Sequence, residues 1–178
     1  MKFNQSPVSV KVKAFFFLFF FAFLAFHSFA QVPLRKGDMQ LNAGLGFSGW
    51  GIPIYAGLEF GFMENITVGG EVSYRSYTDD FNRTNYRHNI FGLYGFGNYH
   101  FNELLEISSK QFDVYAGAGI GFFLWNSSGA YKGSGASGLG IGIQIGGRYY
   151  FNRSFGLNLE LGGNSATSGG KIGITYVY

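Results

Sequence analysis

The sequence predicts an all-β protein whose eight antiparallel strands close into an up-and-down barrel behind a cleaved N-terminal leader. Three observations lead to this prediction. Apolar and polar residues alternate with a period of two in eight segments after residue 38, which is typical of strands with one apolar face. All 29 glycines lie after residue 30, and polar connections separate the eight segments. Closing the sheet removes the two unpaired edges that eight open strands would leave.

The first 30 residues have the pattern of a secretory signal peptide. Three lysines precede an uninterrupted apolar run over residues 14–26, and small residues stand three and one positions before Gln31. A membrane-spanning helix needs about 20 apolar residues, so cleavage after Ala30 is favoured over an uncleaved membrane anchor. The predicted organisation is a signal peptide, residues 1–30, followed by one barrel domain, residues 31–178.

The first four predicted strands are Met39–Phe47, Ile54–Phe62, Ile66–Tyr74 and Ile90–Phe101. In the first three, apolar residues occupy one face, and glycine, amide, hydroxyl and glutamate residues occupy the other. The fourth carries aromatic residues on both faces, with Asn98 and His100 on the polar one, and we expect His100 to be a rim residue. A tight connection of three residues, 63–65, separates the second and third strands, and a polar loop, Thr78–Arg87, is predicted before the fourth.

The last four predicted strands are Phe112–Phe122, Leu139–Phe151, Phe155–Leu161 and Ile172–Tyr178. Each alternates aliphatic or aromatic residues with glycine and polar residues. Their connections are a loop at Leu124–Ser137, a tight turn at residues 152–154 and a loop at Gly162–Gly169. Short connections therefore follow the even strands, apart from Asn102–Gln111, and longer polar connections follow the odd strands.

Composition excludes several classes of function. The chain has no cysteine, which excludes disulfides, thiolate metal sites and an acylated cysteine. Residues 31–178 hold equal numbers of basic and acidic side chains, so the folded part lacks the basic footprint of a nucleic-acid-binding protein. Residues 44–49 and 133–138 match the G-x-G-x-x-G pattern, but neither stands in a strand–helix–strand unit. We predict no cofactor, no metal and no nucleic-acid partner.

The alternation fits two barrels of opposite polarity. A soluble lipocalin-like carrier packs its apolar face inward, whereas a membrane barrel turns that face towards lipid. The polar face of this chain is rich in glycine and poor in charge, which suits a cramped interior better than a wetted exterior. Aromatic residues stand at strand ends beside the short turns. We therefore predict a transmembrane barrel and keep the soluble periplasmic carrier as the alternative.

Residues 31–178 resemble the small outer-membrane barrels of the OmpA/OmpX-like superfamily. The resemblance rests on the leader, the eight alternating strands and the final Gly173–Tyr178, whose sequence is GITYVY. It implies periplasmic termini and short turns, extracellular long loops, and contact with outer-membrane lipid and lipopolysaccharide. It also implies that Tyr176 and Tyr178 form the signal read by the outer-membrane assembly machinery. The family usually ends in Phe, so Tyr178 departs from its pattern.

Charged side chains on the predicted inner face form the first candidate site. Buried charges are costly unless they are paired, so we expect a network of ion pairs that fills the lumen, with an ion or proton relay as the alternative. Glu160 and Lys171 should face each other on adjacent strands, with Arg148 in diagonal reach of Glu160 and Asp113 near the periplasmic rim. The residues of the predicted interior polar network are Glu59, Glu71, Arg75, Arg148, Glu160 and Lys171.

The loops form the second candidate site, because exposed aromatic residues beside charges are typical of recognition surfaces. We predict a non-enzymatic role in envelope integrity or surface interaction. A lipid-modifying outer-membrane enzyme is the alternative, since His88 lies near Asp79 and Asp80 in sequence and a catalytic triad needs such residue types. The candidate loop contacts are Phe81, Arg83, Tyr86, Arg87, Trp125, Tyr131 and Lys132.

Overall fold

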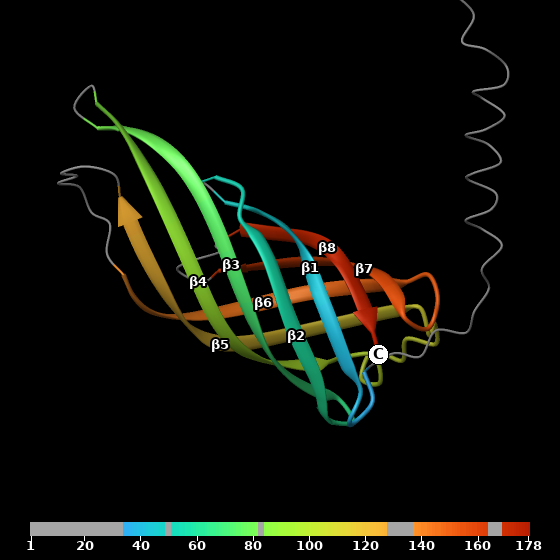
Figure 1. Ribbon diagram of the computed structural model, residues 1–178. Coiled ribbons are helices and arrows are strands. Elements are labelled where there is room, and N and C mark those ends of the chain that lie inside the picture. Colours follow the sequence, from blue (N-terminus) through green and yellow to red (C-terminus); the bar gives the residue numbers. More distant parts are fainter. Residues whose placement is uncertain (1–33, 49–50, 82–83, 128–136, 164–168) are drawn as a thin grey trace, which may run out of the picture.

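A computed structural model of the protein describes residues 34–48, 51–81, 84–127, 137–163 and 169–178. Every strand pairs antiparallel with its neighbour in the chain, and β1 pairs with β8 to close the barrel (Figure 1). No helix in these ranges is long and apolar enough to cross a membrane. The predicted signal peptide lies outside them. The strands are β1 (Met39–Phe47), β2 (Ile54–Met63), β3 (Ile66–Phe81), β4 (Thr84–His100), β5 (Phe112–Ser127), β6 (Gly138–Tyr150), β7 (Phe155–Gly163) and β8 (Gly169–Val177).

The closed eight-stranded barrel confirms the predicted fold class, but two predicted loops are wrong. The β3–β4 ladder continues from Thr78↔Arg87 to Phe81↔Thr84, so most of the predicted loop Thr78–Arg87 is a hairpin. Strand β5 likewise continues to Ser127, into the predicted loop Leu124–Ser137. The polar sequence of these segments indicated loops, yet a ladder with water on both faces needs no apolar face.

Three strands extend beyond the rest of the barrel at one end. The β2–β3 ladder stops at Ile54↔Tyr74, while β3 continues to Phe81 beside β4. The β5–β6 ladder stops at Phe123↔Gly138, while β5 continues to Ser127 beside β4. Figure 1 shows β3, β4 and β5 running past the shorter strands. We call the part beyond Tyr74, Phe91 and Phe123 the projecting sheet.

The barrel reverses the inside–outside order of a soluble protein. Ile141 is 79 % exposed on the outer face, whereas Glu59 on the inner face is 0 % exposed. On β4 the outward residues are apolar or glycine from Tyr99 to Phe91 and become polar at Asn89. Those eight steps span about 27 Å along the strand, or about 21 Å in height at a tilt near 40°, close to the roughly 25 Å apolar band of membrane barrels.

Aromatic side chains ring the end of the barrel that holds the short turns and the chain's C-terminus. Phe112 and Tyr149 have ring centroids 4.9 Å apart, and Tyr149 contacts Phe151 at 5.4 Å. Tyr176 and Tyr178 contact each other at 5.1 Å. The tyrosine rings, which are apolar but carry a polar hydroxyl, suit the boundary between hydrocarbon and water. The opposite end carries the projecting sheet, so the two ends of the barrel differ in chemistry.

Candidate functional site

Glycines on the inner face make room for large side chains from neighbouring strands. A Cβ built on Gly146 would lie 2.4 Å from Cζ of Tyr115, and one on Gly173 would lie 2.5 Å from the Tyr55 hydroxyl. A Cβ on Gly119 would lie 2.7 Å from Cζ of Tyr94. These aromatic rings therefore occupy the space that side chains would fill at the glycines, and the glycine-rich polar face builds a packed lumen.

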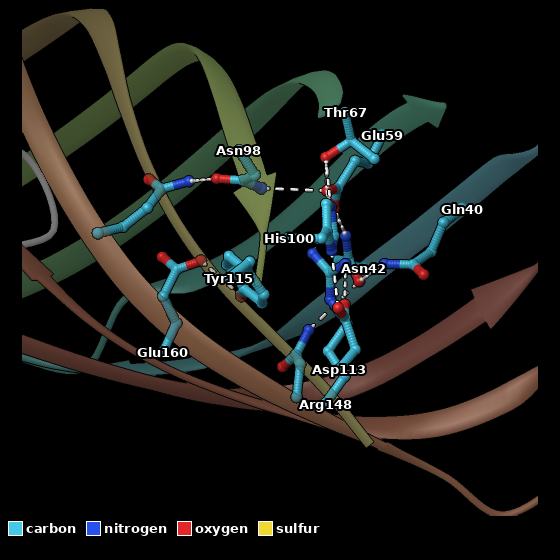
Figure 2. Close-up of polar contacts among 12 residues, drawn as sticks. Gln40, Asn42, Glu59, Thr67, Asn98, His100, Asp113, Tyr115, Arg148 and Glu160 are labelled. Carbon is cyan, nitrogen blue, oxygen red and sulfur yellow. Dashed lines mark hydrogen bonds and ion pairs between the residues drawn. The ribbon is translucent and has the colours of Figure 1, made fainter. Parts of the chain in front are cut away.

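An ion cluster lies in the half of the lumen nearer the short turns. Arg148 on β6 donates from Nη2 to Oε2 of Glu59 at 2.5 Å and from Nη1 to Oδ2 of Asp113 at 3.1 Å. Asp113 is the direct β5 neighbour of Arg148, whereas Glu59 comes from β2 on the opposite wall. The guanidinium also lies 4.2 Å from the Tyr115 ring centroid. We call Glu59, Asp113, Arg148 and His100 the lower cluster (Figure 2).

His100 links the two carboxylates of the lower cluster. Its Nδ1 lies 2.7 Å from Oδ1 of Asp113, and its Nε2 lies 3.0 Å from the Thr67 hydroxyl. The series hydroxyl–imidazole–carboxylate is the arrangement of a catalytic triad. However, Thr67 donates its hydroxyl to Glu59, and both Thr67 and His100 are 0 % exposed. Because the Thr67 hydroxyl already donates to a carboxylate and is inaccessible to a substrate, these contacts hold the side chains in place and do not supply a nucleophile.

Side-chain amides satisfy the remaining oxygens of this region. Asn98 donates to Oε1 of Glu59 at 3.0 Å, and Asn42 donates to Oε2 at 3.1 Å (Figure 2). Gln144 donates to Asn98, and Gln40 donates to Asn42. Glu59 thus accepts from a guanidinium, a hydroxyl and two amides. A carboxylate so fully bonded can remain buried without water.

A second ion cluster lies further towards the projecting sheet. Lys171 Nζ lies 2.7 Å from Oε1 of Glu160, its direct neighbour on β7, and 2.8 Å from Oε2 of Glu71 on β3. The Tyr115 hydroxyl donates to Glu160 at 2.9 Å and so connects β5 to this cluster. Lys171 also lies 5.1 Å from the Tyr55 ring centroid. We call Glu71, Glu160 and Lys171 the upper cluster.

A small cavity lies between the two clusters. It is lined by members of both clusters together with Tyr55 and Tyr115, and it holds about 20 Å³. This volume suffices for about one water molecule. The clusters thus fill the lumen, and the arrangement blocks a wide aqueous path rather than forming one.

Polar and aromatic residues also meet at the mouth of the barrel, in the first rows of the projecting sheet. Arg75 donates from Nη1 to the Ser48 hydroxyl at 3.0 Å. His88 Nδ1 lies 2.8 Å from the Ser127 hydroxyl, and the Trp125 indole donates to both of them. The aspartates that the sequence associates with His88 are exposed on β3, while His88 itself is 0 % exposed. The histidine is therefore packed inside the mouth.

Five of the six residues of the predicted interior polar network are buried, and the sixth, Glu160, is partly buried. Arg75 lies at the mouth beside Ser48 and belongs to neither ion cluster. Glu160 and Lys171 face each other as expected, but Arg148 bonds Glu59 and Asp113 rather than Glu160. Sequence reasoning placed His100 at the rim and assigned no role to Thr67, although the period-two pattern puts both on the polar face. Additional polar residues of the network are Gln40, Asn42, Tyr55, Asn98, Tyr115, Gln144, Tyr150 and Asn158.

Four of the seven candidate loop contacts lie in strands and not in the predicted loops. Phe81 is the last residue of β3, Tyr86 and Arg87 belong to β4, and Trp125 belongs to β5. Their positions are strand positions because the two ladders are longer than the apolar pattern indicates. The other three contacts, Arg83, Tyr131 and Lys132, lie outside the described residues. No group of three or more His, Cys, Asp or Glu side chains in the described ranges could hold a metal ion.

Comparison with known proteins identifies the fold. No protein-family profile matches the chain, and no curated protein matches it either. The outer-membrane protein OprG from Pseudomonas aeruginosa matches with a TM-score of 0.63 and 11 % identity, over 82 % of this chain and 98 % of that one. The N-terminal β-barrel domain of Pseudomonas aeruginosa OprF matches with a TM-score of 0.53 and 14 % identity, over 80 % and 98 %. The chain therefore shares the closed antiparallel β-barrel fold of these two outer-membrane proteins.

Proposed function

We propose that the protein is an integral outer-membrane barrel with a non-enzymatic role, which serves envelope integrity or surface interaction through its projecting sheet. The observation that carries the proposal is the reversed polarity of the barrel. Its exposed outer face is aliphatic and aromatic, whereas its buried inner face carries two ion clusters. In water this arrangement would expose a large apolar surface, while in a bilayer it turns the same surface towards hydrocarbon.

The leader supports the same localisation. Residues 1–30 carry the signal-peptide pattern, and cleavage after Ala30 would release the barrel domain 31–178 into the periplasm. Tyr176 and Tyr178 lie on the outer face at the aromatic end, where the assembly machinery would read the last strand. The termini and short turns would then be periplasmic, and the projecting sheet would be extracellular.

The projecting sheet supports a role at the cell surface. Asp79, Asp80, Asn85 and Arg87 are exposed on it, so it presents both signs of charge beyond the apolar belt. Residues of this kind suit contact with the charged head groups of lipopolysaccharide or with an external partner. In the described part of the chain, the packing between the two clusters leaves a cavity of about 20 Å³, which argues against a wide transport path through the lumen.

Heat-modifiability in fractionated cells tests the proposal. Outer membranes of expressing cells are run on an SDS gel, with boiled and unboiled samples side by side. We expect a band in the outer-membrane fraction that migrates faster unboiled, because the closed barrel resists detergent until it is heated. A soluble periplasmic band without a shift would overturn the proposal and favour the lipocalin-like carrier.

The contact between His88 and Ser127 favours a lipid-modifying enzyme as the second candidate function. A 2.8 Å imidazole–hydroxyl contact is the geometry of a base and its nucleophile. Two features argue against this function. His88 is buried from a substrate, and the Trp125 indole donates to the same Nδ1 atom that would act as the base. Mass spectrometry of lipid A from cells that express the protein or its His88→Ala variant decides between them. Loss of a lipid A modification only in the variant would support the enzyme.

A further inference from the structure

The segment before β1 folds back on itself at the end of the barrel that holds the short turns, which we call the turn end (Figure 1). The Asp38 N–H donates to the Arg35 carbonyl at 3.0 Å, and the Asp38 carboxylate accepts from the Arg35 N–H at 3.3 Å. Lys36 and Gly37 form the turn between them, and Gly37 has a φ of 93°, which the third residue of a type II turn requires. We call residues 34–38 the N-terminal hook.

The N-terminal hook occupies an inner position that glycine leaves empty at the end of β2. Gly61 lies on the same inner face as Glu59, and its N–H donates to the Asp38 carbonyl at 3.0 Å. A Cβ built on Gly61 would overlap the Arg35 carbonyl oxygen. Because an inward Cβ points into the lumen, the backbone of the hook lies inside the barrel wall. A side chain at position 61 would therefore displace the hook.

The lumen is closed at the turn end and partly open at the mouth. Leu34 is 4 % exposed although it stands outside every strand. At the mouth, Tyr77 and Trp125 on the inner face are partly exposed. Polar side chains so close to a barrel end stay dry only where other groups cover them. The inner side chains near the turn end that are at most 2 % exposed are Gln40, Thr67, His100, Asp113, Tyr150 and Thr175.

Two groups close the turn end from different sides. The Tyr150 hydroxyl donates to Oε1 of Gln40 at 2.5 Å and so bridges β6 to β1. The N-terminal hook lies on the other side of β1, against the inner face of β2 at Gly61. The tyrosine bridge therefore leaves the β2 side to be covered by the hook.

We infer that the N-terminal hook is a plug that seals the lumen at the turn end and keeps water from the lower cluster. Leu34 is the apolar part of the plug, and the backbone of the hook fills the space beside Gly61. Keeping the site dry strengthens its buried ion pairs, because opposite charges attract each other more strongly at low dielectric. The seal is a property of the closed barrel, and only its periplasmic location rests on the proposed function.

Cysteine labelling tests the plug, because the chain has no cysteine of its own. Two reporter changes on the inner face of β3 are compared, Thr67→Cys at the register partner of Gly61 and Ser73→Cys nearer the mouth. The folded barrel in neutral detergent is treated with 2-aminoethyl methanethiosulfonate, and mass spectrometry follows the labelling. We expect slow labelling at residue 67 that Gly61→Val or Leu34→Ser accelerates about tenfold or more, because either change opens the turn end locally. Labelling at residue 73 should stay the same.

Gly70→Val is the matched control for Gly61→Val. Gly70 is an exposed, outward glycine of β3, and a Cβ built on it would have its nearest atom at 3.9 Å. This change should leave both labelling rates unchanged. Each variant is first checked for the shift between boiled and unboiled samples, so that loss of folding is separated from loss of the seal.

Fast labelling at residue 67 with the hook intact overturns the plug, and so does slow labelling that neither hook variant changes. A hook variant that accelerates labelling at residues 67 and 73 alike also overturns it, because the whole barrel has then loosened. A protein that shifts on boiling but gives one of these results refutes the plug alone, whereas a soluble protein without a shift refutes the proposed function.

Discussion

Replacement of Arg148 by alanine should destabilise the barrel more than any other single truncation in the lower cluster. The guanidinium contributes hydrogen bonds to two carboxylates that are at most 1 % exposed, at 2.5 Å to Glu59 and 3.1 Å to Asp113. Removing it leaves two buried anions with His100 as the remaining ionisable neighbour that contacts both of them. Breaking a buried ion pair by removing one partner costs about 3–5 kcal/mol. We therefore expect a loss of about 3–5 kcal/mol in the free energy of unfolding.

The double variant Arg148→Met with Glu59→Gln separates charge from packing. It removes one charge of each sign, keeps Asp113 beside His100 and nearly preserves the volume. We expect it to recover at least half of the loss, because replacing both partners of a buried pair is often close to neutral. Arg153→Ala, at an exposed arginine in the turn between β6 and β7, is the surface control and should change stability by less than about 0.5 kcal/mol.

Equilibrium urea unfolding of the barrel refolded into lipid vesicles measures these changes, with tryptophan fluorescence and the heat-induced gel shift as two independent probes. The linear dependence of the unfolding free energy on urea converts midpoints into differences. A loss below about 1 kcal/mol for Arg148→Ala would refute the reasoning, because it would mean that water or movement of neighbours compensates the anions. A double variant less stable than the single one would refute the electrostatic origin of the loss.

Three further predictions concern the lumen and the last strand. Gly146→Ala should lower the free energy of unfolding in urea by about 1–3 kcal/mol, because the new Cβ would lie 2.4 Å from the Tyr115 ring. The control Gly70→Ala, on the outer face, should lower it by less than about 0.5 kcal/mol, because the nearest atom would lie 3.9 Å away. Planar bilayers with the folded protein should show no steady open-pore current, because a cavity of about 20 Å³ passes no hydrated ion; large, long-lived openings would contradict the filled lumen. Tyr178→Ser should reduce the heat-shifted band in outer membranes while Tyr178→Phe retains it, and equal bands for the two variants would argue against an aromatic assembly signal.

The fold was predictable because one physical pattern runs through the whole barrel. Alternation with a period of two defines the faces of all eight strands, and the high glycine and low charge content of the polar face assign that face to the inside. The period-two alternation no longer identifies a strand where both faces of the sheet are exposed to water. Asp79, Asp80 and Asn85 lie in a regular ladder, yet nothing in their polarity distinguishes a water-exposed strand from a loop. The projecting sheet was therefore missed.

The sequence predicts which residues belong to the site better than it predicts which of them contact each other. Glu160 and Lys171 pair directly across the β7–β8 hairpin. Their pairing therefore follows from how far each lies from the connection between the two strands. Arg148 and Glu59 stand on opposite walls, and their meeting depends on how far the strands are staggered around the closed barrel. No local pattern in a single sequence predicts how far the strands are staggered around the barrel. His100 is the last residue of β4, so the sequence gives its place at the strand end but not its contacts with Asp113 and Thr67.

The buried ion pairs of the lumen fix the register of the strands, which the apolar outer face cannot do. Alternation alone leaves the register undetermined by steps of two residues, because such a slip keeps every side chain on its own face. A slip of two between β7 and β8 would move Lys171 about 7 Å from Glu160 along the strand, beyond the reach of their 2.7 Å contact. The same slip between β5 and β6 would separate Asp113 from Arg148 and drive Tyr115 off the space at Gly146. Each slip breaks a buried ion pair at a cost of several kcal/mol, whereas the hydrocarbon outside accepts any order of aliphatic side chains. The inner polar face, not the larger apolar one, therefore selects a single barrel.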